Sequence, residues 1–298
     1  MRKIFFVLIS FGFSLLFSCD DGDILNVEFD FDDTFQACGD LVFYKTKSDP
    51  SESLSFKVND IDFEDLFVVT AGESVEITSN SNTFNYRTYS NATLPNDLFC
   101  NDIPSSEINI TQDYESTNDL ATFTTSLIED DNDGIPAEFE DINGNGNLED
   151  DDTDGDGIPN YLDEDDDGDN VLTKTENPNY TETDGLSNAQ DTDGDTIPDY
   201  LDTDDDDDGV LTRDEESVDQ DQNPTNDIRD PNIGPDYLNK DVALTEAAIA
   251  YREHTIIQTY TISLIIEGVD LEIISQDFDF GNLEDSDLST SRKLTPEF

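Results

Sequence analysis

The chain has 298 residues, enough for two domains, and carries 74 acidic side chains against 13 basic ones, a formal net charge of −61. This balance excludes a nucleic-acid partner, because nothing in the chain neutralises phosphates. A compact fold with this charge repels itself unless cations are bound inside it. Hydrophobic residues make up only 34% and tryptophan is absent, so the composition indicates one well-packed core and one poorly packed segment.

Residues 1–18 have the pattern of an export signal. Arg2 and Lys3 form a positive start, and residues 4–17 are an apolar run too short for a comfortable transmembrane helix. The following LFSC resembles a bacterial lipobox, which implies that Cys19 is lipidated and becomes the mature N-terminus. The alternative is an ordinary signal peptide with an unrelated cysteine.

Two further cysteines, Cys38 and Cys100, follow this signal. In an exported protein, two remaining cysteines favour a disulfide between them. The bond would close a long loop and contribute about 4 kcal/mol in the chain-entropy description. The alternative is a pair of unpaired, buried thiols.

The segments before and after the acidic centre have the alternation of β-strands. In the first segment, residues 27–31 alternate, residues 41–44 form an apolar run, and a hairpin is predicted with its turn at residues 80–82. In the last segment, residues 240–252 predict a short helix, and residues 255–280 predict further strands. Since two or three strands cannot stand alone, we expect them to complete the N-terminal sheet.

The acidic centre is an internal repeat. Residues 152–176 read DTDGDGIPNYLDEDDDGDNVLTKTE and residues 191–215 read DTDGDTIPDYLDTDDDDDGVLTRDE, identical at 18 of 25 positions. A shorter copy precedes them, and residues 233–238 faintly echo the pattern as a degenerate cap. The alternative, a solvated acidic tract, does not place Gly, Ile-Pro and Tyr-Leu in register.

Each copy contains oxygen-bearing side chains at alternate residues, followed by a turn. Calcium takes about six to eight oxygens, which a twelve-residue loop supplies from side chains at positions 1, 3, 5 and 12 and a carbonyl at position 7. One ion for each matching window predicts about six calcium ions. The apolar anchors of each unit are too few for an ordinary core, so we expect metal binding and folding of these loops to be coupled.

The predicted calcium ligands fall in six successive windows. They are Glu129, Asp131, Asp133 and Glu140; Asp141, Asn143, Asn145 and Asp152; Asp152, Asp154, Asp156, Asn160 and Asp163; Asp165, Asp167, Asp169 and Glu176; Asp191, Asp193, Asp195, Asp199 and Asp202; and Asp204, Asp206, Asp208 and Glu215. Because neighbouring windows abut, Asp163 and Asp202 are candidates for bridging two ions.

The segments DTDGDGIPNYLD and DTDGDTIPDYLD resemble thrombospondin type 3 calcium repeats, and NVLTKTE and GVLTRDE resemble the ends of EF-hand or dockerin-type loops. With its lipobox and flanking β segments, the chain is similar to uncharacterised surface lipoproteins of Gram-negative bacteria. These resemblances imply calcium binding and lipid anchoring at the outer membrane or cell surface. The chain departs from the repeat pattern at Thr196, which replaces a glycine, and at Asn147, which replaces an apolar anchor.

No catalytic motif stands out, and we predict a protein that is not an enzyme. The single histidine, His254, cannot build a zinc site or a histidine-dependent triad with anything visible. Besides calcium and the membrane, we expect an unidentified protein or glycan partner. The alternatives are an exported enzyme, such as a peptidyl-prolyl isomerase, and a carbohydrate-binding β-sandwich with Phe84, Tyr86 and Tyr89 as its aromatic face.

The predicted fold class is mostly β. An antiparallel β-sandwich or sheet forms from the N- and C-terminal segments, and a loop-rich calcium-binding repeat array is inserted between them. The predicted divisions are a signal peptide (1–18), a tether (19–24), an N-terminal β domain (25–128), the repeats (129–216), a linker (217–239) and a C-terminal β segment (240–298).

Overall fold

The computed structural model describes residues 29–39, 41–101, 105–217 and 220–298. The signal, Cys19, the tether and the start of the first predicted strand lie outside these residues. The described chain is mostly β, as predicted, and its strands form one mixed sheet of ten. No described helix is long and apolar enough to cross a membrane.

The sheet runs in the order β4-β7-β8-β9-β1-β2-β3-β5-β6, with β10 pairing with β8. The strands are β1 (Thr34–Cys38), β2 (Val42–Ser48), β3 (Ser51–Val58), β4 (Ser74–Ser79), β5 (Asn82–Tyr89), β6 (Ile110–Thr117), β7 (Leu120–Asp130), β8 (His254–Leu271), β9 (Ile274–Leu283) and β10 (Ser289–Leu294). All neighbours pair antiparallel except β1 and β9, which pair parallel.

The helical segments are single 3-10 turns, and most lie in the acidic centre. They are η1 (Phe63–Phe67), η2 (Ala137–Phe139), η3 (Leu148–Asp150), η4 (Asn160–Leu162), η5 (Thr173–Glu176), η6 (Asp199–Leu201), η7 (Thr212–Asp214), η8 (Pro224–Asn226), η9 (Asp236–Leu238) and η10 (Ser286–Leu288). Turns η2 to η7 lie within the predicted repeats, and η8 and η9 lie in the predicted linker that follows them.

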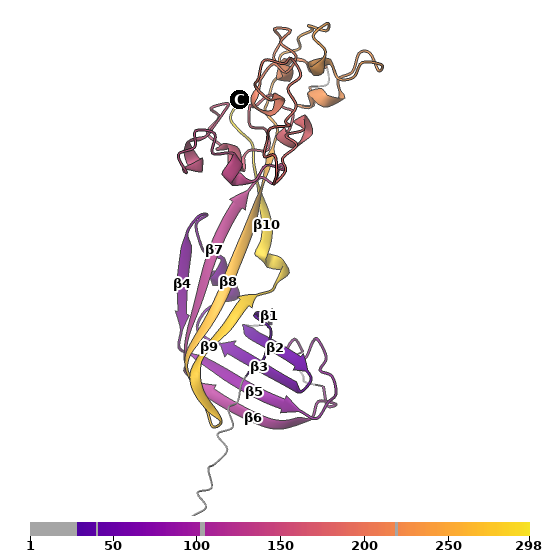
Figure 1. Cartoon of the computed structure of the whole chain (residues 1–298). Helices are drawn as coiled ribbons and strands as arrows, with labels where there is room; N and C mark the ends of the chain where they lie inside the picture. Colours follow the sequence, from indigo (N-terminus) through magenta and orange to yellow (C-terminus); the bar gives the residue numbers. More distant parts are fainter. Residues whose placement is uncertain (1–28, 40, 102–104, 218–219) are drawn as a thin grey trace, which may run out of the picture.

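The sheet folds over itself, so that two layers enclose one apolar core (Figure 1). Ring contacts cross between the layers: the centroids of Phe43 on β2 and Phe123 on β7 are 5.1 Å apart, and those of Phe84 on β5 and Phe278 on β9 are 5.2 Å apart. This arrangement is a β-sandwich, in which alternate residues of each strand face the core.

The repeat array is an insertion between two paired strands. Strands β7 and β8 are antiparallel, in a register that runs from Leu120 opposite Glu267 to Asp130 opposite Ile257. The chain leaves the sandwich at the end of β7, builds the array, and returns as β8 (Figure 1). The C-terminal segment therefore completes the N-terminal sheet, which confirms the predicted fold class.

Of three local predictions, one is confirmed and two are wrong. The predicted hairpin around residues 80–82 is wrong, because β4 pairs with β7 whereas β5 pairs with β3 and β6. The link crosses from one layer to the other, and the Asn82 amide holds it by donating to the Asp119 carbonyl at 2.6 Å. The predicted disulfide between Cys38 and Cys100 is present.

The predicted helix over residues 240–252 is also wrong, because this segment runs back along the array without helical structure. Its backbone is held by partners in the loops: the Glu246 N–H donates to the Asp214 carbonyl at 2.7 Å, and the Arg252 N–H donates to Asn170 Oδ1 at 3.1 Å. These contacts with the array outweigh the local helix preference.

The aromatic residues proposed as a carbohydrate-binding face are buried. Phe84, Tyr86 and Tyr89 lie in the interior of the sandwich, and the Tyr89 hydroxyl is hydrogen-bonded to Ser53 Oγ at 2.7 Å. They therefore stabilise the fold and do not form an exposed platform for sugars.

The alternation along β8 gives a matched pair of residues for testing this core. Leu264 is 0% exposed, and the next residue, Ile265, is 46% exposed. We expect Leu264→Ala to lower the free energy of unfolding of the sandwich by about 2–5 kcal/mol, because it opens a cavity in a packed core. The control, Ile265→Ala, should cost less than about 1 kcal/mol. Urea unfolding at a fixed calcium concentration measures both, and equal losses would contradict the assigned register.

Candidate metal centre

The four loops that begin at Asp152, Asp165, Asp191 and Asp204, and the degenerate cap around Asp236, share a closing clasp of two hydrogen bonds. If the first acid of a loop is position 1, the N–H of position 9 donates to the carbonyl before the loop, as from Asn160 to Asp151 at 2.8 Å. The side chain of position 9 in turn accepts the N–H of position 2, as Asn160 Oδ1 does from Thr153 at 2.9 Å. The same pair of bonds recurs with position 9 at Thr173, Asp199, Thr212 and Asp236.

This clasp occupies two residues that were predicted as calcium ligands. Asn160 also donates its amide to Thr153 Oγ1 at 2.8 Å. Both oxygens of Asp199 accept hydrogen bonds, Oδ1 from the Thr192 N–H at 2.7 Å and Oδ2 from Gln190 Nε2 at 2.6 Å. The structure therefore uses Asn160 and Asp199 to close their loops.

Backbone amides orient the acids at positions 1, 3 and 5. In several loops the carboxylate of position 1 accepts the N–H of position 6, as Asp152 does from Gly157 at 3.1 Å. Acids at positions 3 and 5 accept the N–H two residues on, as Asp154 does from Asp156 at 3.0 Å. At positions 3 and 5 these bonds fix one oxygen and leave the other for a ligand, whereas at position 1 both oxygens can accept N–H groups, as those of Asp152 do.

Position 6 requires a left-handed backbone, which explains its glycine preference. Gly157 and Gly209 have φ of 94° and 92° there, and Thr196 is held at φ 90° in the fifth loop. A β-branched residue in this conformation is strained. The strain expected from the departure at Thr196 is therefore present.

Among the described residues, the structure gathers many of the predicted ligands, together with Asp205, in five clusters, and within each cluster the carboxylate oxygens lie within 4.8 Å of one another. The clusters are Asp131, Asp133 and Glu140; Asp152, Asp154 and Asp156; Asp167, Asp169, Glu176 and Asp205; Asp191, Asp193 and Asp195; and Asp204, Asp206 and Asp208. The cluster that contains Glu176 is fully buried, whereas that of Asp191 is the most exposed.

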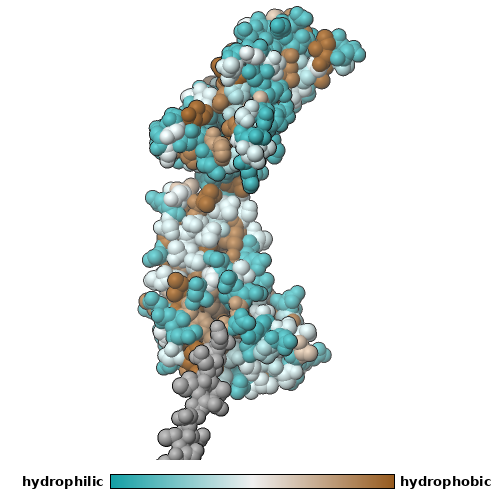
Figure 2. All heavy atoms as spheres, viewed as in Figure 1, coloured by the Kyte–Doolittle hydropathy of each residue, from teal (hydrophilic) through white to brown (hydrophobic). Residues whose placement is uncertain are grey.

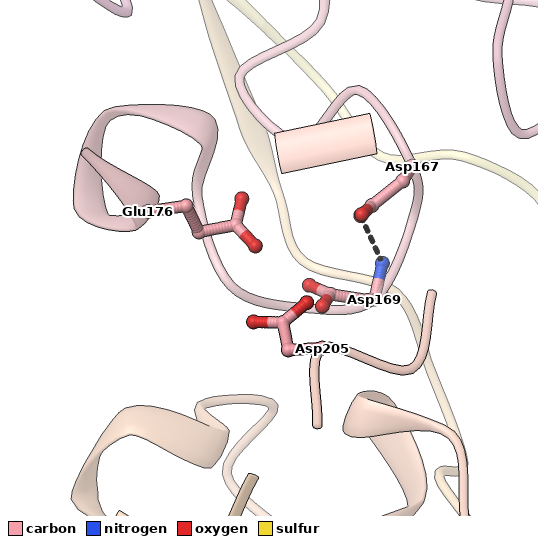
Figure 3. Close-up of side chains that lie close together, drawn as sticks. All are labelled: Asp167, Asp169, Glu176 and Asp205. Carbon is pink, nitrogen blue, oxygen red and sulfur yellow. Dashed lines mark hydrogen bonds between the residues drawn. The ribbon is translucent and has the colours of Figure 1, made fainter. Parts of the chain in front are cut away.

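The central cluster joins two repeats (Figure 3). Asp167, Asp169 and Glu176 come from one loop, and the Asp169 N–H donates to Asp167 Oδ1 at 3.2 Å. Asp205 enters from a separate segment, and its carboxylate points toward those of Asp169 and Glu176 (Figure 3).

Many buried carboxylate oxygens in the array have no hydrogen-bond partner. They belong to Asp131, Asp133, Glu140, Asp154, Asp156, Asp163, Asp165, Asp166, Asp167, Asp169, Glu176, Asp204, Asp205, Asp206, Asp208 and Glu215, among others. Buried acceptors are normally paired, because an unpaired polar group loses its hydration without compensation. A divalent cation satisfies several such oxygens at once.

Burial and mutual repulsion raise the pKa values of these acids. Burial raises the pKa of Asp131 to about 10, with Asp133 and Glu140 adding to the shift. Burial likewise raises the pKa of Glu140 to about 9 and that of Asp205 to about 11, in the latter case assisted by Asp169. The protein alone thus does not offset the charges that it buries here.

Of the acids at position 12, Glu140 and Glu176 belong to clusters, whereas Asp163, Asp202 and Glu215 are not among the acids grouped within 4.8 Å. The latter three still interact with the acids of their loops through their charge. The charge of Asp163 helps to raise the pKa of Asp154, after the larger effect of burial, and Asp195 acts in the same way on Asp202. Glu215 is similarly affected by Asp206. Asp163 also pairs with His254, with 2.6 Å between Oδ1 and Nδ1, so one of its oxygens faces β8 and the other is unpaired.

Some predicted ligands lie outside the five carboxylate clusters. Glu129 forms a two-point ion pair with Arg292 of β10, with both bonds at 2.9 Å. In the second window, Asp141 orients its loop by accepting the Gly146 N–H at 2.8 Å. The amides of Asn143 and Asn145, however, both donate to Asp150 at 3.2 Å. Asp152, predicted for two windows, lies with Asp154 and Asp156. The second window therefore lacks a carboxylate cluster.

Among the buried acids that were not predicted as ligands, Asp166 and Asp205 stand apart, because neither oxygen of either carboxylate has a hydrogen-bond partner. Both occupy position 2 of a loop, which the loop template leaves unassigned. The available signal was the repeat itself, because both near-copies carry an acid at this place, 39 residues apart.

The raised pKa values predict that protons and calcium substitute for each other. Asp133 and Asp206 have pKa values of about 6 and Asp154 about 7, above those of an unfolded chain. Without calcium, the stabilising effect of protonation should be complete near pH 4 and lost as the pH rises through about 6–7. With calcium, acidification from pH 7 to pH 5 should raise the midpoint calcium concentration, since protons compete for the same oxygens.

Near-ultraviolet circular dichroism of the array tyrosines follows this exchange. The far-ultraviolet signal of the sandwich serves as the internal control. A calcium midpoint that stays constant between pH 7 and pH 5 would contradict the expected competition.

Comparison with known proteins adds one partial match. A family model described as BamM C-terminal matches residues 130–189. This span covers the first loops of the array and less than half of the chain. No thrombospondin repeat family is found. The chain has no significant match among curated proteins or among solved structures.

Proposed function

We propose that this chain is a lipid-anchored protein of the bacterial cell envelope that binds several calcium ions through its repeat array. The bound ions would stiffen the array, which then acts as a spacer or as an adhesive module for a protein or glycan partner. The observation that carries the proposal is the set of buried, unpaired carboxylate oxygens, which four of the five clusters among the described residues contain.

The chemistry of the clusters favours calcium over other divalent ions. They consist of carboxylates, without histidine or cysteine, and such oxygen ligands suit hard cations. The irregular loops can surround an ion with more than six oxygens, whereas magnesium demands near-octahedral geometry and keeps several waters. Extracellular calcium near about 1 mM is sufficient for modules of this kind.

The arrangement of the molecule supports a spacing role. The described chain begins in the sandwich, and the array lies beyond the far ends of β7 and β8 (Figure 1). A lipid on Cys19 would thus be attached on the side of the sandwich and leave the array to project away. Hydrophilic side chains cover most of the visible face of the array (Figure 2).

The match to the BamM C-terminal family model supports an association with the bacterial outer membrane. The lipobox-like sequence before Cys19 supports lipid attachment there. Binding without catalysis fits the single histidine, because His254 is buried in its pair with Asp163.

Calorimetric titration of the purified chain with calcium tests the central proposal. We expect uptake of several ions at or below about millimolar concentration, with a gain of order in the array and a more uniform elongated shape in small-angle X-ray scattering. Chelator should reverse both changes, and magnesium at the same concentration is the control. Failure to take up calcium at millimolar concentration would overturn the proposal.

Substitution at the lipobox tests the anchor separately. We expect Cys19→Ser to abolish incorporation of labelled palmitate and to release the chain from the membrane fraction, because one thiol carries the lipid. Calcium uptake by the released chain should be unchanged, since the array does not use this residue. Labelling that persists in Cys19→Ser would show that Cys19 is not the attachment site.

A further inference from the structure

Asp205 contributes its carboxylate to a loop other than its own. It lies in the loop 204–215, yet its oxygen is within 4.8 Å of oxygens from Asp167, Asp169 and Glu176. Its side chain is 1% exposed, and neither oxygen has a hydrogen-bond partner. The other acids of its loop, Asp204, Asp206 and Asp208, form their own cluster without it.

The backbone explains why Asp205 turns away from its loop. Its N–H donates inward to Thr212 Oγ1 at 3.3 Å, as part of the clasp. Asp205 is the second residue of a turn, in which the Asp207 N–H donates to the Asp204 carbonyl at 3.1 Å. Positions 1, 3 and 5 form the cluster of the loop itself, whereas the carboxylate of position 2 lies with the acids of the preceding repeat.

Asp166 is the counterpart of Asp205, and we assign its carboxylate to an earlier loop in the same way. It occupies the equivalent place in the first near-copy, and its N–H donates to Thr173 Oγ1 at 3.1 Å. Its side chain is 2% exposed, and both oxygens lack a partner. The cluster of Asp131, Asp133 and Glu140 is the counterpart of the cluster that Asp205 joins, because both lie earlier in the chain, are fully buried and contain the glutamate of position 12. The charges of Glu140 and Asp133 also add to the effect of burial in raising the pKa of Asp166.

We propose that Asp166 and Asp205 are inter-loop calcium ligands, each completing the ion site of an earlier loop. Asp166 joins the cluster of the loop 131–140, and Asp205 joins that of the loop 165–176. One ion at each place then ties two parts of the chain together, so calcium holds the repeats to one another as well as closing single loops. This inference rests on the proposed calcium binding.

The degenerate cap at residues 233–238 shows where this linkage between loops ends. Position 2 follows the tyrosine of the repeat by five residues in both near-copies, from Tyr161 to Asp166 and from Tyr200 to Asp205. The same step from Tyr237 in the degenerate cap reaches Val242, which has no carboxylate. The last cluster, of Asp204, Asp206 and Asp208, accordingly gains no ligand of this kind and is less buried than the cluster that holds Glu176.

Hydrogen exchange measured by mass spectrometry over a calcium titration of the full chain tests the assignment loop by loop. We expect Asp205→Asn to raise the calcium midpoint for protection of residues 165–176 about tenfold, because ligand charge sets the affinity of such sites. The calcium midpoint for protection of residues 204–215 should rise by less than about threefold. Asp166→Asn should have the corresponding effect on residues 131–140.

Asp207→Asn is the matched control. Asp207 lies two residues from Asp205, is exposed, and has φ 53°, a conformation that asparagine tolerates. It removes the same charge from the same loop, and both midpoints should stay within about twofold of those of the unchanged protein. Protection of β7 and β8 verifies that each variant is folded.

The results separate this inference from the proposed function. No calcium-dependent protection in the unchanged protein would overturn calcium binding itself. If the unchanged protein responds, equal shifts in both loops, a larger shift in residues 204–215, or no shift in either Asp205→Asn or Asp166→Asn would overturn the inter-loop assignment.

Discussion

Repulsion among buried carboxylates is the constraint on which the array depends. Asp167, Asp169, Glu176 and Asp205 converge in a buried space, with oxygens within 4.8 Å of one another and only partly hydrogen-bonded. Apolar contact in the array is sparse: one buried cluster there consists of Ile158, Leu162 and Ile256. Hydrophobic burial therefore cannot offset the cost of burying so much charge. A divalent ion bound at such a cluster, as we propose, would turn the same groups from a destabilising set into cross-links of the fold.

The array is nevertheless joined firmly to the sandwich, and one short stretch of β8 makes the joint. Ile256 packs against Ile158 and Leu162 of the array. The Thr255 N–H donates to Glu164 Oε2 at 2.6 Å, and His254 pairs with Asp163. Asp163 is the last predicted ligand of the loop that begins at Asp152, and it contacts His254, the first residue of β8. If the array binds calcium as we propose, this joint would couple ion binding to the start of a core strand.

The sequence predicted those features that local periodicity encodes. The alternation of residues predicted β8. The repeat predicted most members of the five clusters, because loop ligands lie at fixed spacings on one stretch of chain. Pairings between distant segments were less accessible: β4 alternates as a hairpin strand would, but its partner is β7. Glu129 was predicted as a calcium ligand but pairs with Arg292. This ion pair could not be predicted for the same reason, since it depends on β10 lying beside β8.

The same distinction explains the errors within the loops. Asn160 and Asp199 satisfy the ligand template by spacing, yet the clasp requires an acceptor at position 9 for the N–H of position 2. Threonine performs this task in the alternate loops at Thr173 and Thr212, which shows that position 9 needs a hydrogen-bonding oxygen and not a charge. The clasp in turn fixes position 2 with its N–H inward and its side chain outward. The hydrogen-bonding residue at position 9 thereby directs the acid at position 2 toward the neighbouring cluster. The arrangement of the array thus depends on hydrogen bonds that a ligand template does not contain.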